Sequence, residues 1–349
     1  MEKKIKPEIP DAFLWLKDLP KEAAAERFTA QQMAVCENCG RSNAPTRLAC
    51  LYCGATMKIA DEPGAQARPV LRRLENWEKG WNVVCQPIKD AGSADFDEVM
   101  LAQTAAFLRL DRAELDKILT AQHALPFAQA ESETEAAVVE KYLQANNFKT
   151  TVIADADLQV TIAPRRVRTV EFGENHLSLI LIGKNDQPTQ LVFDEIELFV
   201  VGAIFERQVE NREQRKGRDA FEIKDSRELS TDEQVLDFYT RGDQIGYRIS
   251  AKNFDFSCLG AEKRMLAYDN FRILLEKLKN HVASATFDDS YKRLRGALNP
   301  VWQPDHRNES IGWQHEGIGK ISIDNRLTVN NSAQFLRYSR MLHQLTNNN

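Results

Sequence analysis

The sequence predicts a multidomain protein of the α+β class. It should contain a small cysteine-organised module, a β-α-α-β-α-β sandwich, and a mainly antiparallel, barrel-like β domain closed by a long helix. Three observations lead to this prediction. Four cysteines form two close pairs near the N-terminus. Strand-like and helix-like patterns alternate over residues 70–158, and short strand-like runs separated by turn residues dominate residues 160–285.

The two cysteine pairs occur in the runs Cys36-Glu37-Asn38-Cys39-Gly40 and Cys50-Leu51-Tyr52-Cys53-Gly54. Each C-x-x-C turn presents two thiolates, and zinc prefers four such ligands in a tetrahedron. The glycine after each pair frees the backbone to turn. Because four cysteines leave no open position for water, we expect one structural zinc ion in a zinc ribbon. The predicted ligands are Cys36, Cys39, Cys50 and Cys53.

Paired cysteines have other uses besides a zinc site. A redox dithiol or two disulfides would also use paired cysteines, but two matched pairs favour a metal. Iron also accepts four thiolates, and the spacing favours zinc without excluding iron. A module this small has almost no core of its own, so we expect it to unfold without its metal.

The composition bounds the class of protein. The chain has 349 residues, of which 43% are hydrophobic and 28% charged, as in a typical globular protein. Its formal net charge of -5 argues against a strongly basic nucleic-acid binder. No run approaches the roughly 18 apolar residues that span a bilayer. We therefore expect a cytoplasmic protein with no membrane insertion.

Composition shifts divide the chain into six segments. Pro63, Gly64 and Pro69 mark a linker. The segments are a helical arm (1–30), the zinc ribbon (31–60), the linker (61–69), an α+β domain (70–158), a β-rich domain (160–285) and a C-terminal extension (286–349).

The α+β domain has a readable element order. A capping box, Ser132-Glu133-Thr134-Glu135, opens its last helix. Pro126 indicates an edge strand, because proline cannot donate to a strand ladder. The predicted elements are a strand at 81–85, helices at 97–109 and after Asp111, a strand at 125–128, a helix from 132 to 143 and a strand at 148–153.

This order and its local pattern resemble the C-terminal domain of the ribosomal stalk protein and the related fold of the Clp-protease adaptor. The resemblance is carried by Trp81-Asn82-Val83-Val84, by Leu115-Asp116-Lys117-Ile118-Leu119, and by residues 130–136 with 148–152. It implies a fold used for docking proteins. The family's lysine- and glycine-rich first helix turn is replaced here by Ala102-Gln103-Thr104-Ala105-Ala106, so its particular contacts are not carried over.

The β-rich domain has about seven strand-like runs followed by one long helix, Met265 to Val282. That order resembles the pleckstrin-homology-like barrel. The mixed-charge stretch from Glu206 to Glu233 indicates a solvated loop or surface helix, or else a recognition loop over the barrel mouth. In the extension we expect a strand at Ile321–Val329 and a helix at Ser332–Leu345.

The ribbon sequence follows the pattern C-x2-C-x3-N-x6-C-x2-C, with Asn43 as the asparagine. It resembles the Ran-binding-protein type of zinc finger and the short bacterial double-knuckle ribbons. The first family binds RNA bases or ubiquitin with the help of an aromatic residue just before the first cysteine pair. Here Met33-Ala34-Val35 occupies that place, and Arg41 and Arg47 are the basic residues between the pairs.

Motifs for catalysis are missing. The sequence has no Walker A, G-x-G-x-x-G, H-E-x-x-H or G-x-S-x-G motif. His306 and His315 are a weak candidate for a second metal site, and Asp155 and Asp157 indicate a turn. We therefore expect a non-catalytic adaptor or regulatory protein that binds a protein partner. The alternative is an RNA- or ribosome-associated factor that uses the ribbon, and neither the partner nor the oligomeric state follows from the sequence.

Overall fold

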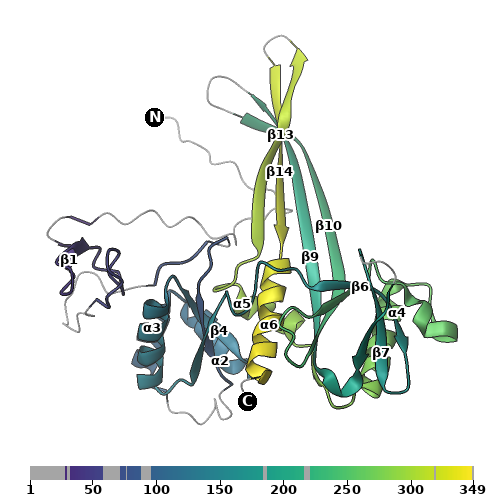
Figure 1. The fold of residues 1–349 in the computed structure, drawn as a ribbon. Coiled ribbons are helices and arrows are strands. Elements are labelled where there is room, and N and C mark those ends of the chain that lie inside the picture. Colours follow the sequence, from purple (N-terminus) through teal and green to yellow (C-terminus); the bar gives the residue numbers. More distant parts are fainter. Residues whose placement is uncertain are drawn as a thin grey trace.

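The computed structural model describes residues 28–29, 32–57, 71–75, 77–87, 96–183, 187–215, 221–317 and 320–347. The expected linker, and the expected helical arm apart from residues 28–29, lie outside them. Within the described residues the chain is a mixed α+β protein with a small cysteine module and a large, mainly antiparallel sheet (Figure 1). No helix in this part of the chain is both long and apolar enough to cross a membrane.

The cysteine module contains one short antiparallel pair of strands, β1 (Ala34–Val35) and β2 (Ser42–Asn43). Its buried apolar cluster is formed by Cys36, Cys50 and Met57. Three residues bury far too little apolar surface to stabilise an independent fold. We therefore expect the module to depend on an ion held by its four cysteines.

The middle unit has the element order expected from the sequence, and its strands form one antiparallel sheet in the order β4-β3-β5. Side-chain caps begin its helices: Asp97 accepts a hydrogen bond from the Val99 amide, and Ser132 accepts one from the Glu135 amide. The elements are β3 (Trp81–Cys85), α1 (Glu98–Leu108), α2 (Arg112–Thr120), β4 (Leu125–Ala130), α3 (Glu133–Ala145) and β5 (Thr150–Ala154).

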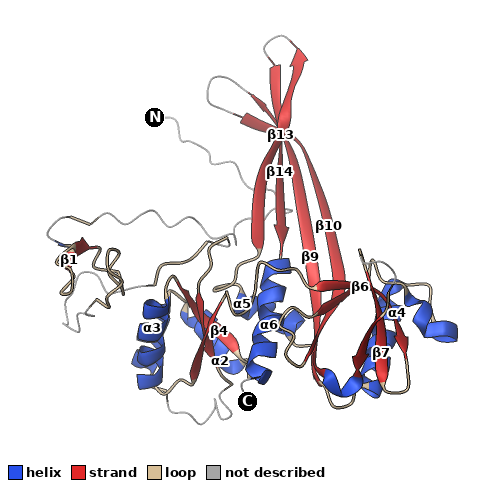
Figure 2. Ribbon diagram, in the orientation of Figure 1, coloured by secondary structure: helices blue, strands red, loops and turns tan. Residues whose placement is uncertain are grey.

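The large sheet runs in the order β13-β14-β9-β10-β11-β6-β7-β8, and β12 pairs with the base of β9 (Figure 2). Its strands are β6 (Arg165–Phe172), β7 (His176–Leu181), β8 (Thr189–Val192), β9 (Ile196–Arg215), β10 (Phe221–Thr240), β11 (Tyr247–Ser250), β12 (Thr286–Asp288), β13 (Asp305–Gly317) and β14 (Lys320–Asn330). The associated helices are η3 (Phe193–Glu195), η4 (Phe256–Glu262), α4 (Ala267–His281), α5 (Tyr291–Leu298) and α6 (Ser332–Asn347).

The expected barrel-like closure is wrong, because this sheet is open and has β13 and β8 at its two ends. β11 pairs with β6 in parallel, which a simple antiparallel meander would not do. Strands β12, β13 and β14, from the segment expected to be an extension, widen the sheet instead of closing it. The expected long helix is present as α4, and it packs on the core cluster beneath β6 and β7. The strand and the helix expected near the C-terminus are present as β14 and α6.

The mixed-charge stretch expected as a loop or surface helix forms the outer parts of two long strands. β9 and β10 pair along almost their whole length, and β14 extends the sheet on the other side of β9. In Figure 1 these strands and β13 project from the body. We call this projection the arm; its described residues are 204–215, 221–233, 305–317 and 320–330.

The charge pattern of the arm follows from its cross-strand neighbours. Opposite charges on adjacent strands face each other, and such pairs stabilise a sheet by a few tenths of a kcal/mol to about 1 kcal/mol each. Because the partners come from distant parts of the sequence, the stretch resembles a solvated loop when it is read alone. The ion pairs join Arg207 to Glu228 (3.3 Å), Arg212 to Asp324 (3.0 Å) and Arg326 to Glu210 (2.6 Å).

The C-terminal helix α6 lies between the middle unit and the large sheet (Figure 1). Its residues Phe335, Tyr338 and Met341 are fully buried in a core that includes residues of β3, β4 and β9. Gly202 of β9 allows this contact, since a Cβ atom at that position would lie 2.4 Å from the Phe335 ring. The helix thereby joins the middle unit and the sheet into one core.

This close approach predicts that Gly202→Ala destabilises the protein by about 1–3 kcal/mol, the usual cost of overpacking a core. The Phe335 ring is enclosed and has little room to move away. Chemical denaturation of both proteins measures the difference. Gly296→Ala is the matched control, because a Cβ atom there meets nothing within 4 Å and helix α5 favours alanine over glycine. An equal effect of the two substitutions would contradict the packing argument.

Candidate metal centre

Each of the two cysteine pairs forms the same tight turn. The Gly40 amide donates a hydrogen bond to the Cys36 carbonyl (2.8 Å), and the Gly54 amide donates one to the Cys50 carbonyl (2.9 Å). Both glycines have left-handed backbone, with φ of +68° and +71°. Glycine adopts this conformation without a steric penalty, which explains why it follows each pair.

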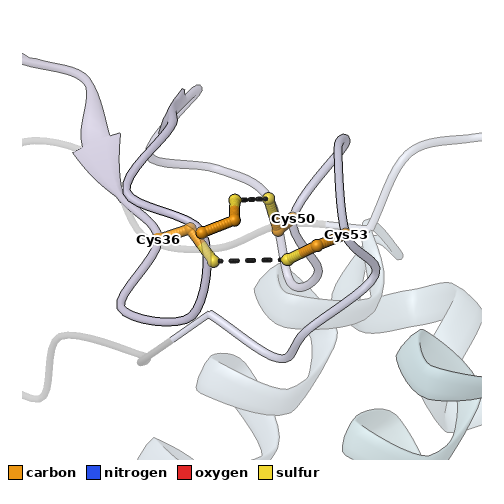
Figure 3. Close-up of side chains that lie close together, drawn as sticks. Cys36, Cys50 and Cys53 are labelled. Carbon is orange, nitrogen blue, oxygen red and sulfur yellow. Dashed lines mark hydrogen bonds between the residues drawn. The ribbon is translucent and has the colours of Figure 1, made fainter.

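The four thiols converge on one point. All four sulfur atoms lie within 4.8 Å of one another. The closest contacts join the two turns: Cys36 Sγ is 3.7 Å from Cys53 Sγ (Figure 3). Cys39 Sγ is 3.6 Å from Cys50 Sγ. Zinc–sulfur bonds of about 2.3 Å in a tetrahedron place the sulfurs about 3.8 Å apart. The four predicted ligands therefore fit a tetrahedral metal ion, although this geometry does not identify the metal.

The same distances contradict the disulfide alternative. A disulfide bond is about 2.05 Å long, so the observed contacts are not covalent, and all four cysteines are free. A C-x-x-C redox pair would bring the sulfurs of one turn together, whereas the closest contacts here join different turns. Among the described residues, this is the one group of cysteine, histidine or acidic side chains close enough to hold a metal ion.

Asn43 ties the two turns together. Its side-chain oxygen accepts a hydrogen bond from the Leu51 amide (2.8 Å). Its side-chain nitrogen donates to the Arg41 carbonyl (2.9 Å) and to Cys50 Sγ (3.4 Å). The side chain is buried, so no solvent replaces these bonds. This is the physical reason for an asparagine at that place of the ribbon pattern.

Hydrogen bonds prepare some of these thiols to act as thiolates. Burial alone would raise the pKa of Cys50, but hydrogen bonds from the Tyr52 and Cys53 amides and from Asn43 outweigh it and bring the pKa to about 6. The Arg41 amide lowers the pKa of Cys39, but burial and the neighbouring sulfurs raise it to about 12. Four thiolates without a cation repel one another, and a divalent ion at their centre removes that repulsion.

We call the cysteine module, residues 32–57, the ribbon. Its surface carries exposed apolar side chains. Val35, Leu51 and Tyr52 are 62%, 61% and 52% exposed. The guanidinium of Arg41 lies 4.7 Å from the centre of the Tyr52 ring. The zinc-finger resemblance places an aromatic residue before the first cysteine pair, whereas the exposed aromatic residue here, Tyr52, lies inside the second pair and was not predicted. The sequence did contain a signal for the exposure of Tyr52. A residue between two cysteines of a C-x-x-C pair lies in a turn too short to bury its side chain.

Leu48 connects the ribbon to the body. Leu48 is 1% exposed and belongs to the large core shared by the middle unit and α6, not to the ribbon's own cluster. The ribbon is thus docked through Leu48, while Leu51 and Tyr52 remain accessible.

The weaker candidate sites do not assemble. His306 and His315 both lie on β13, nine positions apart and hence about 30 Å apart along the strand. They are too far apart to share an ion. Asp155 is enclosed among hydrogen-bond donors, whereas Asp157 is exposed on the surface.

Comparison with protein-family models, with curated proteins and with solved structures finds no match to this chain. The geometry alone defines the class: a mixed α+β protein with a four-cysteine site that fits a metal ion.

Proposed function

We propose that this protein is a non-catalytic, zinc-containing adaptor that binds a protein partner through its ribbon. The observation that carries the proposal is the exposure of Val35, Leu51 and Tyr52 on a module that has almost no core of its own. A metal-organised turn holds apolar side chains in water at a defined geometry, and exposed apolar and aromatic residues are typical anchors of protein interfaces.

The donor set supports a structural ion. Four thiolates close the coordination shell of zinc and leave no position for a reacting water molecule. Zinc is favoured over iron by the spacing of the two pairs. In this proposal the ion only shapes the ribbon, and the side chains around it make the contacts.

The middle unit supports a docking role through its β-α-α-β-α-β order and its antiparallel sheet. That pattern resembles the stalk-protein and Clp-adaptor domains, which bind other proteins. The resemblance contributes a fold class and no particular contact.

We predict that Leu51→Ala/Tyr52→Ala abolishes capture of the partner while zinc content and stability stay unchanged. Exposed residues contribute little to the free energy of unfolding, usually within about 0.5 kcal/mol. The measurement is an affinity pull-down from the native cell with nuclease treatment, read by mass spectrometry, beside metal analysis of the purified variant. Met265→Ala, a fully exposed apolar residue outside the ribbon, is the matched control. A partner captured equally by all three proteins would count against the ribbon as the docking surface.

The contact between Arg41 and Tyr52 favours a second candidate, an RNA- or ribosome-associated factor. A guanidinium over an aromatic ring forms a platform on which bases of single-stranded RNA stack. Captured ribosomal or RNA-bound material that disappears with nuclease, and with Tyr52→Ala, would support this candidate. RNA binding that is absent even at low salt would remove it.

A further inference from the structure

A cavity of about 610 Å³ lies where the base of the arm meets the middle unit. Its walls come from the α1–α2 connection, β9, β10, α5 and the start of β13. The volume is in the range of small-molecule sites, which is about 300–1,000 Å³. Four arginines line it: Arg73, Arg109, Arg207 and Arg295.

Three of these arginines have no carboxylate partner in the part of the chain that the structure describes. Among the described residues, no carboxylate oxygen lies within 4.0 Å of the guanidinium of Arg73, Arg109 or Arg295. The Arg295 guanidinium lies 5.4 Å from the centre of the Phe205 ring, and this contact orients its plane. Arg207, in contrast, is paired with Glu228. The lining of the cavity thus includes three arginines that have no carboxylate within 4.0 Å among the described residues.

The backbone of Arg109 is a second, independent observation. It ends helix α1 in the left-handed region (φ 57°, ψ 35°), and its amide donates to the carbonyls of Ala105 and Ala106. Glycine is the residue that adopts this helix-ending conformation without strain. An arginine here is strained relative to glycine, and Gln122, Asn147 and Gln159 share this left-handed conformation.

Three acidic residues, Asp111, Glu114 and Asp232, line the cavity beside the four arginines. The Glu114 carboxylate accepts a hydrogen bond from the Asp111 amide (2.8 Å), so both residues close the start of helix α2. Asp232 is exposed on β10. With Asn299 and Gln303, it offers acceptors and amides for hydroxyl or amino groups of a ligand.

We propose that this cavity binds a small phosphate ester of nucleotide size. Guanidinium groups bind phosphate through two parallel hydrogen bonds, and three arginines without a carboxylate partner among the described residues line this cavity. A nucleic acid would instead need a basic track, but Arg207, Arg212 and Arg326 of the arm are all paired with carboxylates. The site is separate from the ribbon and does not depend on the adaptor proposal.

Isothermal titration of the full-length, zinc-loaded protein tests this inference. The probes are ATP, AMP and ribose 5-phosphate, with adenosine as the phosphate-free control. We expect saturable binding of at least one phosphorylated probe, none of adenosine, and weaker binding as salt increases.

Arg109→Gly is the decisive variant, because glycine relieves the left-handed strain while it removes the guanidinium, so misfolding cannot explain lost binding. We expect Arg109→Gly and Arg295→Gln each to weaken binding by about tenfold or more, the usual value of one charge-assisted hydrogen bond. Arg272→Gln, on the exposed face of α4, should bind like the wild type.

Three results would overturn the inference. They are no binding of any phosphorylated probe at millimolar concentration, binding that persists unchanged in both variants, or binding of an RNA oligonucleotide or phosphopeptide through these arginines without binding of the small esters.

Discussion

The chain carrying Cys36→Ser and Cys39→Ser is expected to lose its metal and the fold of the ribbon, while the body remains folded. Structural zinc in small modules contributes about 10–16 kcal/mol of apparent binding free energy at neutral pH, far more than the three-residue ribbon cluster can supply. The body should lose at most the contribution of the Leu48 contact, about 1.5–3 kcal/mol.

Metal analysis and amide hydrogen exchange measure the two parts of this prediction. We expect one ion per chain in the wild type and none in the variant, with loss of exchange protection confined to residues 32–57. Cys85→Ser and Cys258→Ser are the controls, since both thiols lie outside the ribbon. A variant that keeps ribbon protection without metal would show that the ribbon does not depend on its ion.

Asp155→Ala is expected to destabilise the body by about 3–5 kcal/mol, the usual effect of leaving a buried charge without its partner. The Asp155 side chain is completely enclosed. Its carboxylate accepts hydrogen bonds from the Gly80 amide (3.0 Å), Asn82 (2.9 Å) and Gln129 (2.7 Å). Arg337 of α6 lies 3.4 Å away and would be left as an uncompensated charge.

Chemical denaturation of the two proteins measures this loss. Asp157→Ala is the matched control, because Asp157 lies two residues further along the chain and is exposed. It should change the free energy of unfolding by no more than about 0.5 kcal/mol. Similar effects of the two substitutions would mean that the network around Asp155 contributes little to stability. The sequence pattern places both residues in a turn, and only their burial in the structure distinguishes them.

Features decided by near neighbours were predictable. The four candidate metal ligands lie within eighteen residues, Cys36 to Cys53, and their spacing alone indicates the geometry that the sulfurs adopt. The capping box at Ser132 begins a helix because its hydrogen bond to Glu135 is local.

Features that depend on residues far apart in the sequence were not predictable from it. The arm was expected as a loop or surface helix because its charges resemble a solvated segment. Its strands are stabilised by partners far along the chain, as in the ion pair between Arg212 and Asp324. The expected barrel was wrong for the same reason, namely pairing between distant segments: β14, which pairs with β9, comes more than a hundred residues later.

The sequence by itself determined the four-cysteine cluster, the α+β class and the order of elements in the middle unit, because each rests on hydrogen bonds or turns between residues near one another. Only the tertiary structure decided the arm, the enclosure of α6 and the gathering of Arg73, Arg109 and Arg295 around one cavity. Those features depend on which distant segments pack together, and hydrophobic burial specifies that only when the whole chain has folded.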